Sequence, residues 1–104
     1  NYVTIWMRQP KMTNLMSWVR QCVKAGNFRD TRHATDRRNE RRISREEVLY
    51  VLKHGHHEKK KDKHDSFYQA WNYAIRGKTV DRRELRIVIS CNPQGLWIIT
   101  AMTV

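Results

Sequence analysis

Residues 67–75 read Phe67-Tyr68-Gln69-Ala70-Trp71-Asn72-Tyr73-Ala74-Ile75, and this stretch decides the fold class. Its large side chains alternate, so that Phe67, Trp71 and Ile75 share one face of a predicted strand. Apolar residues before this stretch follow a helical period, whereas those after it keep a period of two. Helices followed by an antiparallel meander predict an α+β domain, with N-terminal helices packed on a small antiparallel sheet.

Two further strands are predicted after this one. Arg76-Gly77-Lys78 is expected to turn the chain, and apolar residues then alternate from Leu85 to Cys91. Asn92-Pro93-Gln94-Gly95 has the residue preferences of a type I turn. The last strand, 96–104, is apolar on both faces, which favours a central position in the sheet.

Three helices are predicted before the strands. The first carries an apolar stripe from Leu15 to Val23, with Thr13 as its expected N-cap and Gly26 at its end. The second covers the polar run 32–42 and is capped by Asp30 or Thr31. The third, Arg45–His54, follows Ser44-Arg45-Glu46-Glu47, which is a capping box. Gly55 closes it, and His56–Asp65 is expected to form a polar loop or the outer part of a hairpin.

The length and composition of the chain limit the functions that it can have. The 104 residues predict one domain over 12–104, with 1–11 as a tail or added sequence. Lys and Arg number 21 against 10 Asp and Glu, a formal charge of +11 that predicts a polyanionic partner. No apolar stretch is long enough for a membrane span or for a signal peptide. The two cysteines fit no metal or redox spacing, and we expect reduced thiols.

The run that follows Arg32 carries the main functional signal. His33, Arg37 and Arg41 are four residues apart, so a helix stacks them on one face. Metal-free RNA cleavage needs a base, a cation for the phosphate and an acid, and histidine and arginine supply these groups. The alternative is a solvated basic face. Arg38 in the same run is a further candidate RNA contact.

Four stretches of the chain resemble segments of two families in the RelE-like ribonuclease superfamily. His33–Ser44 resembles the His-Ala-x-x-Arg-x-x-x-Arg-x-Ile-Ser segment of an uncharacterised toxin-like family, which Tyr73–Gly77 and Ile98–Thr100 also match. Val19–Arg32 resembles the first helix and connector of MqsR-type mRNA interferases. Both belong to the RelE-like superfamily, which includes barnase, EndoU and colicin-type nucleases.

That resemblance implies a RelE/barnase-like fold and a metal-independent endoribonuclease without cofactor. It implies a growth-arresting toxin of a toxin–antitoxin or effector–immunity pair, acting on RNA, with mRNA expected, in its own or a target cell's cytoplasm. The expected partners are RNA, an acidic antitoxin or immunity protein, and the ribosome.

Other residues complete the predicted site. Tyr73 is expected to present its hydroxyl in the cleft as a second proton donor, beside a core Trp71. We expect phosphate contacts from five further cations: Arg76, Lys78, Arg86, Lys60 and Lys61. The histidines at 54, 56, 57 and 64 lack metal-site spacing, so no metal is expected.

Two other functions fit the same sequence. A non-catalytic basic module for RNA, ribosome or protein explains the charge equally well, and a tRNA- or DNA-directed nuclease delivered into competitors is a third interpretation. No phosphate-binding loop, dinucleotide glycine pattern or serine-nucleophile elbow is present, which argues against ATPases, dehydrogenases and hydrolases of those types.

Overall fold

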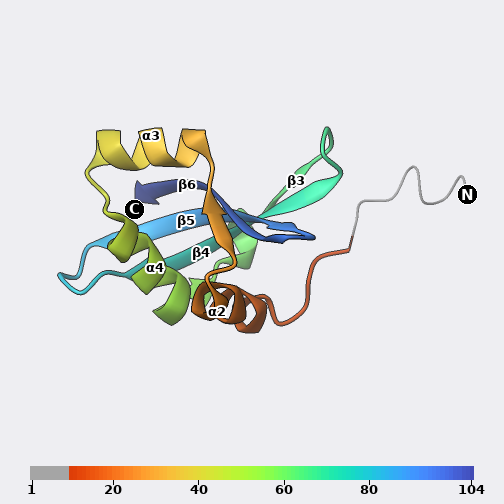
Figure 1. The fold of residues 1–104 in the computed structure, drawn as a ribbon, viewed down its shortest axis with the longest axis horizontal. Coiled ribbons are helices and arrows are strands. Elements are labelled where there is room, and N and C mark those ends of the chain that lie inside the picture. The colour runs from red at the N-terminus through yellow and green to blue at the C-terminus, as the bar shows by residue number, and fades with distance from the viewer. Residues whose placement is uncertain (1–9) are drawn as a thin grey trace, which may run out of the picture.

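The computed structural model describes residues 10–104 as three α-helices packed with a six-stranded sheet (Figure 1). The α+β fold predicted from the sequence is thereby confirmed. The expected tail falls mainly on residues 1–9, outside the described residues. The elements are α2 (Leu15–Ala25), β1 (Phe28–Asp30), α3 (Arg32–Arg41), α4 (Arg45–His54), β2 (His56–His57), the 3-10 helix η1 (Lys59–Lys61), β3 (Lys63–Asp65), β4 (Ala70–Lys78), β5 (Glu84–Asn92) and β6 (Gly95–Thr103).

The sheet is mixed, which corrects the expectation of a purely antiparallel one. Its order is β1-β6-β5-β4-β2, with β3 also on β4. β1 runs parallel to β6, whereas the other pairs are antiparallel. From the sequence, the three residues of β1 were interpreted as part of a connector. They form a strand because the free edge of β6 offers backbone groups with which they pair. β6 is therefore interior, as predicted, although β5 occupies the centre.

Helices α2 and α4 cover one face of the sheet, and Figure 1 shows them on the same side. Their apolar stripes meet alternate residues of β4, β5 and β6. The shared core comprises Leu15, Val19, Val23, Val48, Val51, Leu52, Ile75, Ile87, Ile89 and Ile98. The period of each segment therefore identified the buried face correctly.

α3 packs along β6, apart from the pair α2 and α4 (Figure 1). Thr31 caps it, accepting a hydrogen bond from the Ala34 N–H at 3.1 Å. Thr31 also donates through its backbone N–H to the Ile98 carbonyl at 3.1 Å, which joins the helix start to the sheet. Ala34, the one apolar residue of this polar helix, is fully buried.

The cap predicted for α4 is confirmed, whereas the cap predicted for α2 is not. The capping box of α4 is complete, since Ser44 and Glu47 bond reciprocally at 2.9 and 3.1 Å. α2 begins after Asn14, which has a φ of 52° and provides no side-chain cap, so the prediction of a Thr13 cap is wrong. Gly26 ends α2 with a φ of 73°, the left-handed conformation expected there.

Both predicted boundaries of β4 are displaced along the chain. The Asp65 carboxylate accepts hydrogen bonds from the Phe67 and Tyr68 N–H groups at 3.0 and 3.1 Å, so these residues form a turn. At the other end, Arg76-Gly77-Lys78 stays in the strand, and the turn comes at residues 79–83. The Thr79 hydroxyl accepts a hydrogen bond from the Arg83 N–H at 3.0 Å, which closes this turn.

Two glycines allow a test of close packing. A Cβ on Gly55 would lie 2.6 Å from both the Arg76 and the Val51 carbonyl oxygens. A Cβ on Gly26 would meet nothing within 4 Å, although its φ of 73° disfavours other residues.

We expect Gly55→Ala to lower the free energy of unfolding by about 2–3 kcal/mol, because backbone atoms must move. Gly26→Ala is the control and should lower it by about 1 kcal/mol, from backbone conformation alone. Urea unfolding followed by tryptophan fluorescence measures both. Equal losses in the two variants would contradict the close approach of Gly55 to β4.

Candidate functional site

The sheet face opposite α2 and α4 is the candidate functional surface, and we call it the uncovered face. It carries the half-buried side chains that alternate with the core: Asn72, Arg76, Arg86, Val88, Ser90, Trp97, Thr100 and Met102. Register places Asn72 opposite Ser90 and Arg76 opposite Arg86. A polar pair and a cationic pair thus lie across β4 and β5 on this face, with the apolar pair Ala74–Val88 between them.

Two adjoining grooves run over the uncovered face. The first, of about 370 Å³, is lined by Lys61, Lys63, Asn72, Arg86, Val88, Thr100 and Met102. The second, of about 540 Å³, includes Tyr68, Ser90, Pro93, Trp97 and Ile99, and Asn72 also lines it. Three cations therefore border the first groove. The second groove has aromatic and apolar groups beside polar ones, including the Asp65 carboxyl group.

A carboxylate holds the two arginines of this face together. Arg86 donates to Glu58 through Nε at 2.6 Å and through Nη2 at 3.3 Å. Arg76 donates to the same carboxylate at 3.1 Å, and to Glu84 at 3.1 Å. Two arginines directly across an antiparallel pair would repel each other, so Glu58 compensates a conflict that the register creates.

The arginines keep Glu58 ionised. The Arg86 hydrogen bond, followed by that of Arg76, lowers the pKa of Glu58 to about 2 against the opposing effect of burial. The side chain is only 15% exposed. The uncovered face therefore holds a partly buried carboxylate, two guanidinium groups and two nearby lysine side chains.

The predicted α3 residues are arranged differently from expectation. His33 and Arg37 are exposed, and Arg37 pairs with Glu40 at 3.3 Å. Arg41 turns to the sheet, donating to the Ala101 carbonyl at 2.7 Å and to the Thr100 hydroxyl at 3.4 Å. The structure therefore brings Arg41 to the rim of the first groove.

The structure contradicts the role predicted for Arg38. It was expected to contact RNA, but its side chain is only 10% exposed and lies 3.3 Å from the Asp30 carboxylate. It also donates to the Ile43 carbonyl at 3.4 Å. Arg38 faces β1 because it follows Ala34 by one helical turn, so it stabilises the packing of α3 instead of offering a surface cation.

The structure also contradicts the position predicted for the Tyr73 hydroxyl. It was expected to present its hydroxyl in the cleft, but it is 4% exposed and belongs to the core under α2. Its hydroxyl accepts a hydrogen bond from the Met12 N–H at 2.8 Å, and burial raises its pKa. β5 and β6 also separate β4 from α3, so Tyr73 does not join His33.

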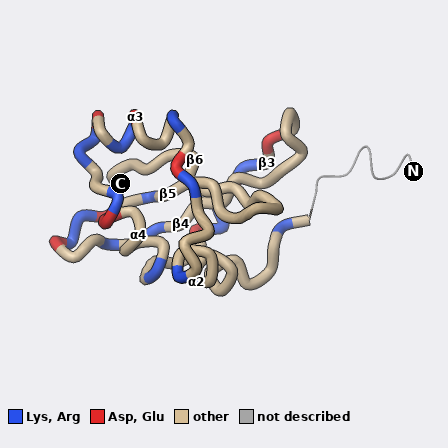
Figure 2. The backbone as a smooth tube through the Cα atoms, viewed as in Figure 1, with Lys and Arg blue, Asp and Glu red and all other residues tan. Residues whose placement is uncertain are grey.

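The other predicted cations divide into two groups. Arg76, Arg86 and Lys61 lie together on or beside the uncovered face. Lys78 is exposed at the end of β4, opposite Glu84, and Lys60 is exposed on η1 without lining either groove. Figure 2 shows lysine and arginine positions on the helices as well as on the strands.

The sequence analysis missed two acidic residues in the stretch interpreted as a polar loop. Glu58 organises the uncovered face, and the fully buried Asp62 carboxylate bonds His57, Lys11 and the Ala74 N–H. The signal was an isolated acid on each side of a lysine run. Within residues 10–104, no group of three or more histidine, cysteine, aspartate or glutamate side chains is arranged to hold a metal ion.

Comparison with known proteins places the chain in a family. A family model described as a domain of unknown function, DUF4258, matches residues 31–103, which is more than half of the chain. The match begins at the cap of α3 and includes all of the uncovered face. No curated protein matches the chain. In the described part of the chain, no helix has the length and apolar character needed to cross a bilayer.

The lowered pKa of Glu58 predicts a pH dependence of stability. Ionised Glu58 stabilises the fold above its unfolded pKa of about 4.5, and this contribution is lost as pH falls towards 2. Glu58→Gln should lower the free energy of unfolding by about 1–2 kcal/mol at pH 7. The difference from the unsubstituted protein should shrink steadily below about pH 4.5. Urea unfolding across this pH range measures it.

Glu40→Gln is the matched control, because Glu40 pairs with Arg37 on an exposed helix surface. It should differ little from the unsubstituted protein at any of these pH values. A Glu58→Gln deficit that persists unchanged at pH 2.5 would contradict the claim that Arg86 and Arg76 hold Glu58 ionised.

Proposed function

We propose that this chain, which belongs to the DUF4258 family, is a metal-independent endoribonuclease that binds RNA on the uncovered face of its sheet. The observation that supports this most is the Glu58–Arg76–Arg86 cluster beside a groove lined by Lys61 and Lys63. It combines a proton acceptor with several phosphate-binding cations in one place. The resemblance to RelE-like ribonucleases points to the same chemistry.

The first groove suits a phosphodiester backbone. Arg86 forms one wall and the two lysines stand on the neighbouring β3 side, where Lys63 is in register with Asn72. A guanidinium binds two phosphate oxygens at once, and the ammonium groups attract the chain over longer distances. In the adjoining groove, Trp97 and Tyr68 offer flat surfaces on which unpaired bases stack.

Cleavage follows from transfer of two protons. Glu58 accepts the proton of a ribose 2′-hydroxyl as the 2′-oxygen bonds to phosphorus. The bond from phosphorus to the 5′-oxygen breaks, and a lysine ammonium of the groove protonates the departing oxygen. The products are a 2′,3′-cyclic phosphate and a 5′-hydroxyl end, and Arg86 stabilises the charge that develops on the phosphoryl oxygens.

Substrate binding would make Glu58 a stronger base. Its pKa is about 2 chiefly because Arg86 bonds it. A phosphate competes with the carboxylate for the same guanidinium donors. When Arg86 turns to the phosphate, the pKa of Glu58 rises towards the range in which a carboxylate accepts protons effectively.

His33 remains a second proposed acid–base group. It is exposed on α3, whose residue Arg41 reaches the rim of the first groove at Thr100. Arg37 and Arg41 on the same helix would extend the cationic path. We therefore propose that α3 guides RNA onto the uncovered face. A His33 variant is tested alongside the Glu58 variant.

We also propose a biological setting. The protein would act as a growth-arresting toxin on cytoplasmic RNA, with mRNA as its main substrate and the ribosome as a further partner. Its formal charge of +11 favours an acidic antitoxin or immunity protein as its neutralising partner. The second candidate function is a non-catalytic RNA-binding module, favoured by the ion pairs that already occupy Arg76 and Glu58.

The test is cleavage of a defined single-stranded RNA in excess EDTA, with the product ends mapped. We expect multiple turnovers and 2′,3′-cyclic phosphate ends. Glu58→Gln should reduce the rate by about 100-fold or more, since the proton acceptor is lost while the side-chain size is kept. His33→Ala reports separately on α3. The assay is repeated with translating ribosomes.

Glu84→Gln is the matched control, because Glu84 contacts Arg76 but has no described contact with Arg86. It should retain cleavage to within about threefold, if Arg76 alone is disturbed. Binding of RNA without any cleavage, in both assay formats, would reject the enzyme in favour of the non-catalytic module. Full activity in folded Glu58→Gln would remove Glu58 from the mechanism.

A further inference from the structure

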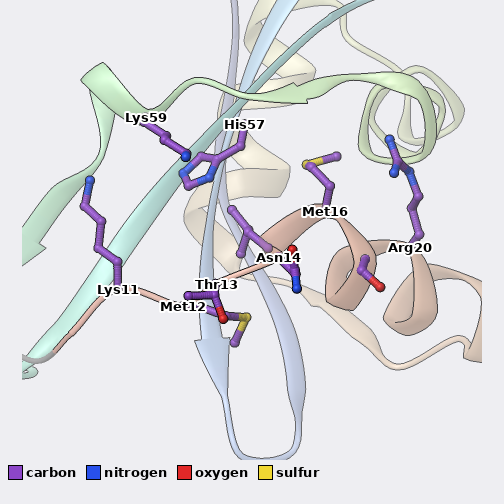
Figure 3. A pocket seen from close by; sticks show the side chains of 10 residues that line it. Lys11, Met12, Thr13, Asn14, Met16, Arg20, His57 and Lys59 are labelled. Atoms are coloured by element: carbon purple, nitrogen blue, oxygen red, sulfur yellow. The ribbon is translucent and has the colours of Figure 1, made fainter.

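A second cavity lies on the other side of the sheet edge from the Glu58 cluster. It is an open pocket with a volume of about 720 Å³, lined by the segment Lys11–Asn14, the first turns of α2, and β2 with η1. Figure 3 shows side chains from all three parts around it, including His57, Lys59 and Arg20. His57 is in register with the core residue Ile75, which places it on the α2 side of the sheet.

The charged groups of the lining are basic. Lys11, Arg20 and Lys59 border the pocket together with His57, among neutral side chains such as Met12 and Met16. Among the described residues that line it there is no carboxylate, although the buried Asp62 contacts Lys11 and His57. Arg20 is held in place from behind, since its Nε donates to the Lys53 carbonyl at 2.8 Å. Positive groups from three separate segments thus surround one cavity. Such a site attracts anions, because three basic side chains with His57 outnumber the single Asp62 carboxylate that contacts Lys11 and His57.

His57 is oriented by a buried acid. Its Nε2 lies 2.7 Å from Asp62 Oδ2, and the Asp62 side chain is completely buried. Lys11 Nζ contacts the same oxygen at 3.0 Å, while Asp62 Oδ1 accepts the Ala74 N–H at 3.0 Å. Asp62 thereby fixes the ring and leaves Nδ1 as the nitrogen it does not use. The imidazole itself is 11% exposed, at the cavity wall.

We propose that this cavity binds a phosphate monoester, with Lys59, Lys11 and His57 as its phosphate ligands. The two ammonium groups offer donors to a doubly charged phosphate. Because His57 Nε2–H points to Asp62, the ring donates through Nδ1 only as the imidazolium, which the phosphate charge would favour. The volume is within the range of small-molecule sites, so a nucleoside can accompany the phosphate. The two surfaces draw on different residues of η1, since Lys59 lines this pocket and Lys61 lines the first groove of the uncovered face. The proposal does not depend on RNA cleavage.

The first test is NMR titration of the full chain with AMP, using adenosine as the uncharged comparison. AMP should shift the ring signals of His57 and the amides of Lys11–Ser17, whereas adenosine should leave them unchanged. Lys59→Gln should weaken AMP binding about tenfold, which corresponds to one charge-assisted hydrogen bond. It keeps the His57–Asp62 pair, so the fold is expected to persist.

Lys60→Gln is the matched control, because Lys60 is exposed on η1 and does not line the cavity. It should leave AMP binding within about twofold if only the overall charge changes. Equal weakening by both variants, or shifts with adenosine alone, would overturn the proposal. A second arm compares a short RNA carrying a 5′-phosphate with its 5′-hydroxyl form. Shifts of His57 with the phosphorylated RNA would make an RNA end the source, and shifts with AMP alone a free nucleotide.

Discussion

The carboxylate of Glu58 is the constraint on which the uncovered face depends. The register of β4 and β5 places Arg76 opposite Arg86, an arrangement that is unfavourable for two cations on neighbouring strands. Glu58 bonds both, at 3.1 and 2.6 Å. The positive charge of this chain is therefore not simply spread over the surface. At this point two arginines lie together, because Glu58 bonds both of them and Glu84 bonds Arg76 as well.

The short segment from β2 to η1 contributes side chains to both faces of the sheet. Successive side chains in an extended segment point to opposite sides, so His57 faces the core side while Glu58 faces the arginines. Gly55 makes the approach to β4 possible, because any Cβ there would strike two carbonyl oxygens. The Ala74 carbonyl then accepts the Glu58 N–H at 2.8 Å, which fixes the segment against the sheet. Two cationic surfaces, on opposite sides of one edge, follow from this geometry.

The sequence predicted what local periodicity and capping control. The apolar stripes, the Ser44–Glu47 capping box and the strand alternation determine the α+β class and most of the core. It did not predict β1, whose three residues become a strand only through pairing with β6. The strand period puts Tyr73 on the same face as the core residue Ile75, so its burial followed from the pattern and the expected cleft hydroxyl did not. Arg38 was misplaced because a helical period tells which side chains share a face, not which face is buried when polar residues dominate. Glu58 was missed because its partners are 18 and 28 residues away.

We propose that RNA phosphates bind the uncovered face through the Glu58 cluster. The most direct measurement is an NMR map of the protein with a 2′-O-methyl oligonucleotide, which has no free 2′-hydroxyl and therefore binds without being cleaved. We expect shifts at Asn72, Ser90 and Thr100 and in the Nε signal of Arg86, and these shifts should weaken steeply with added salt. Shifts confined to α2 and α4, with the Arg86 signal unchanged, would contradict it.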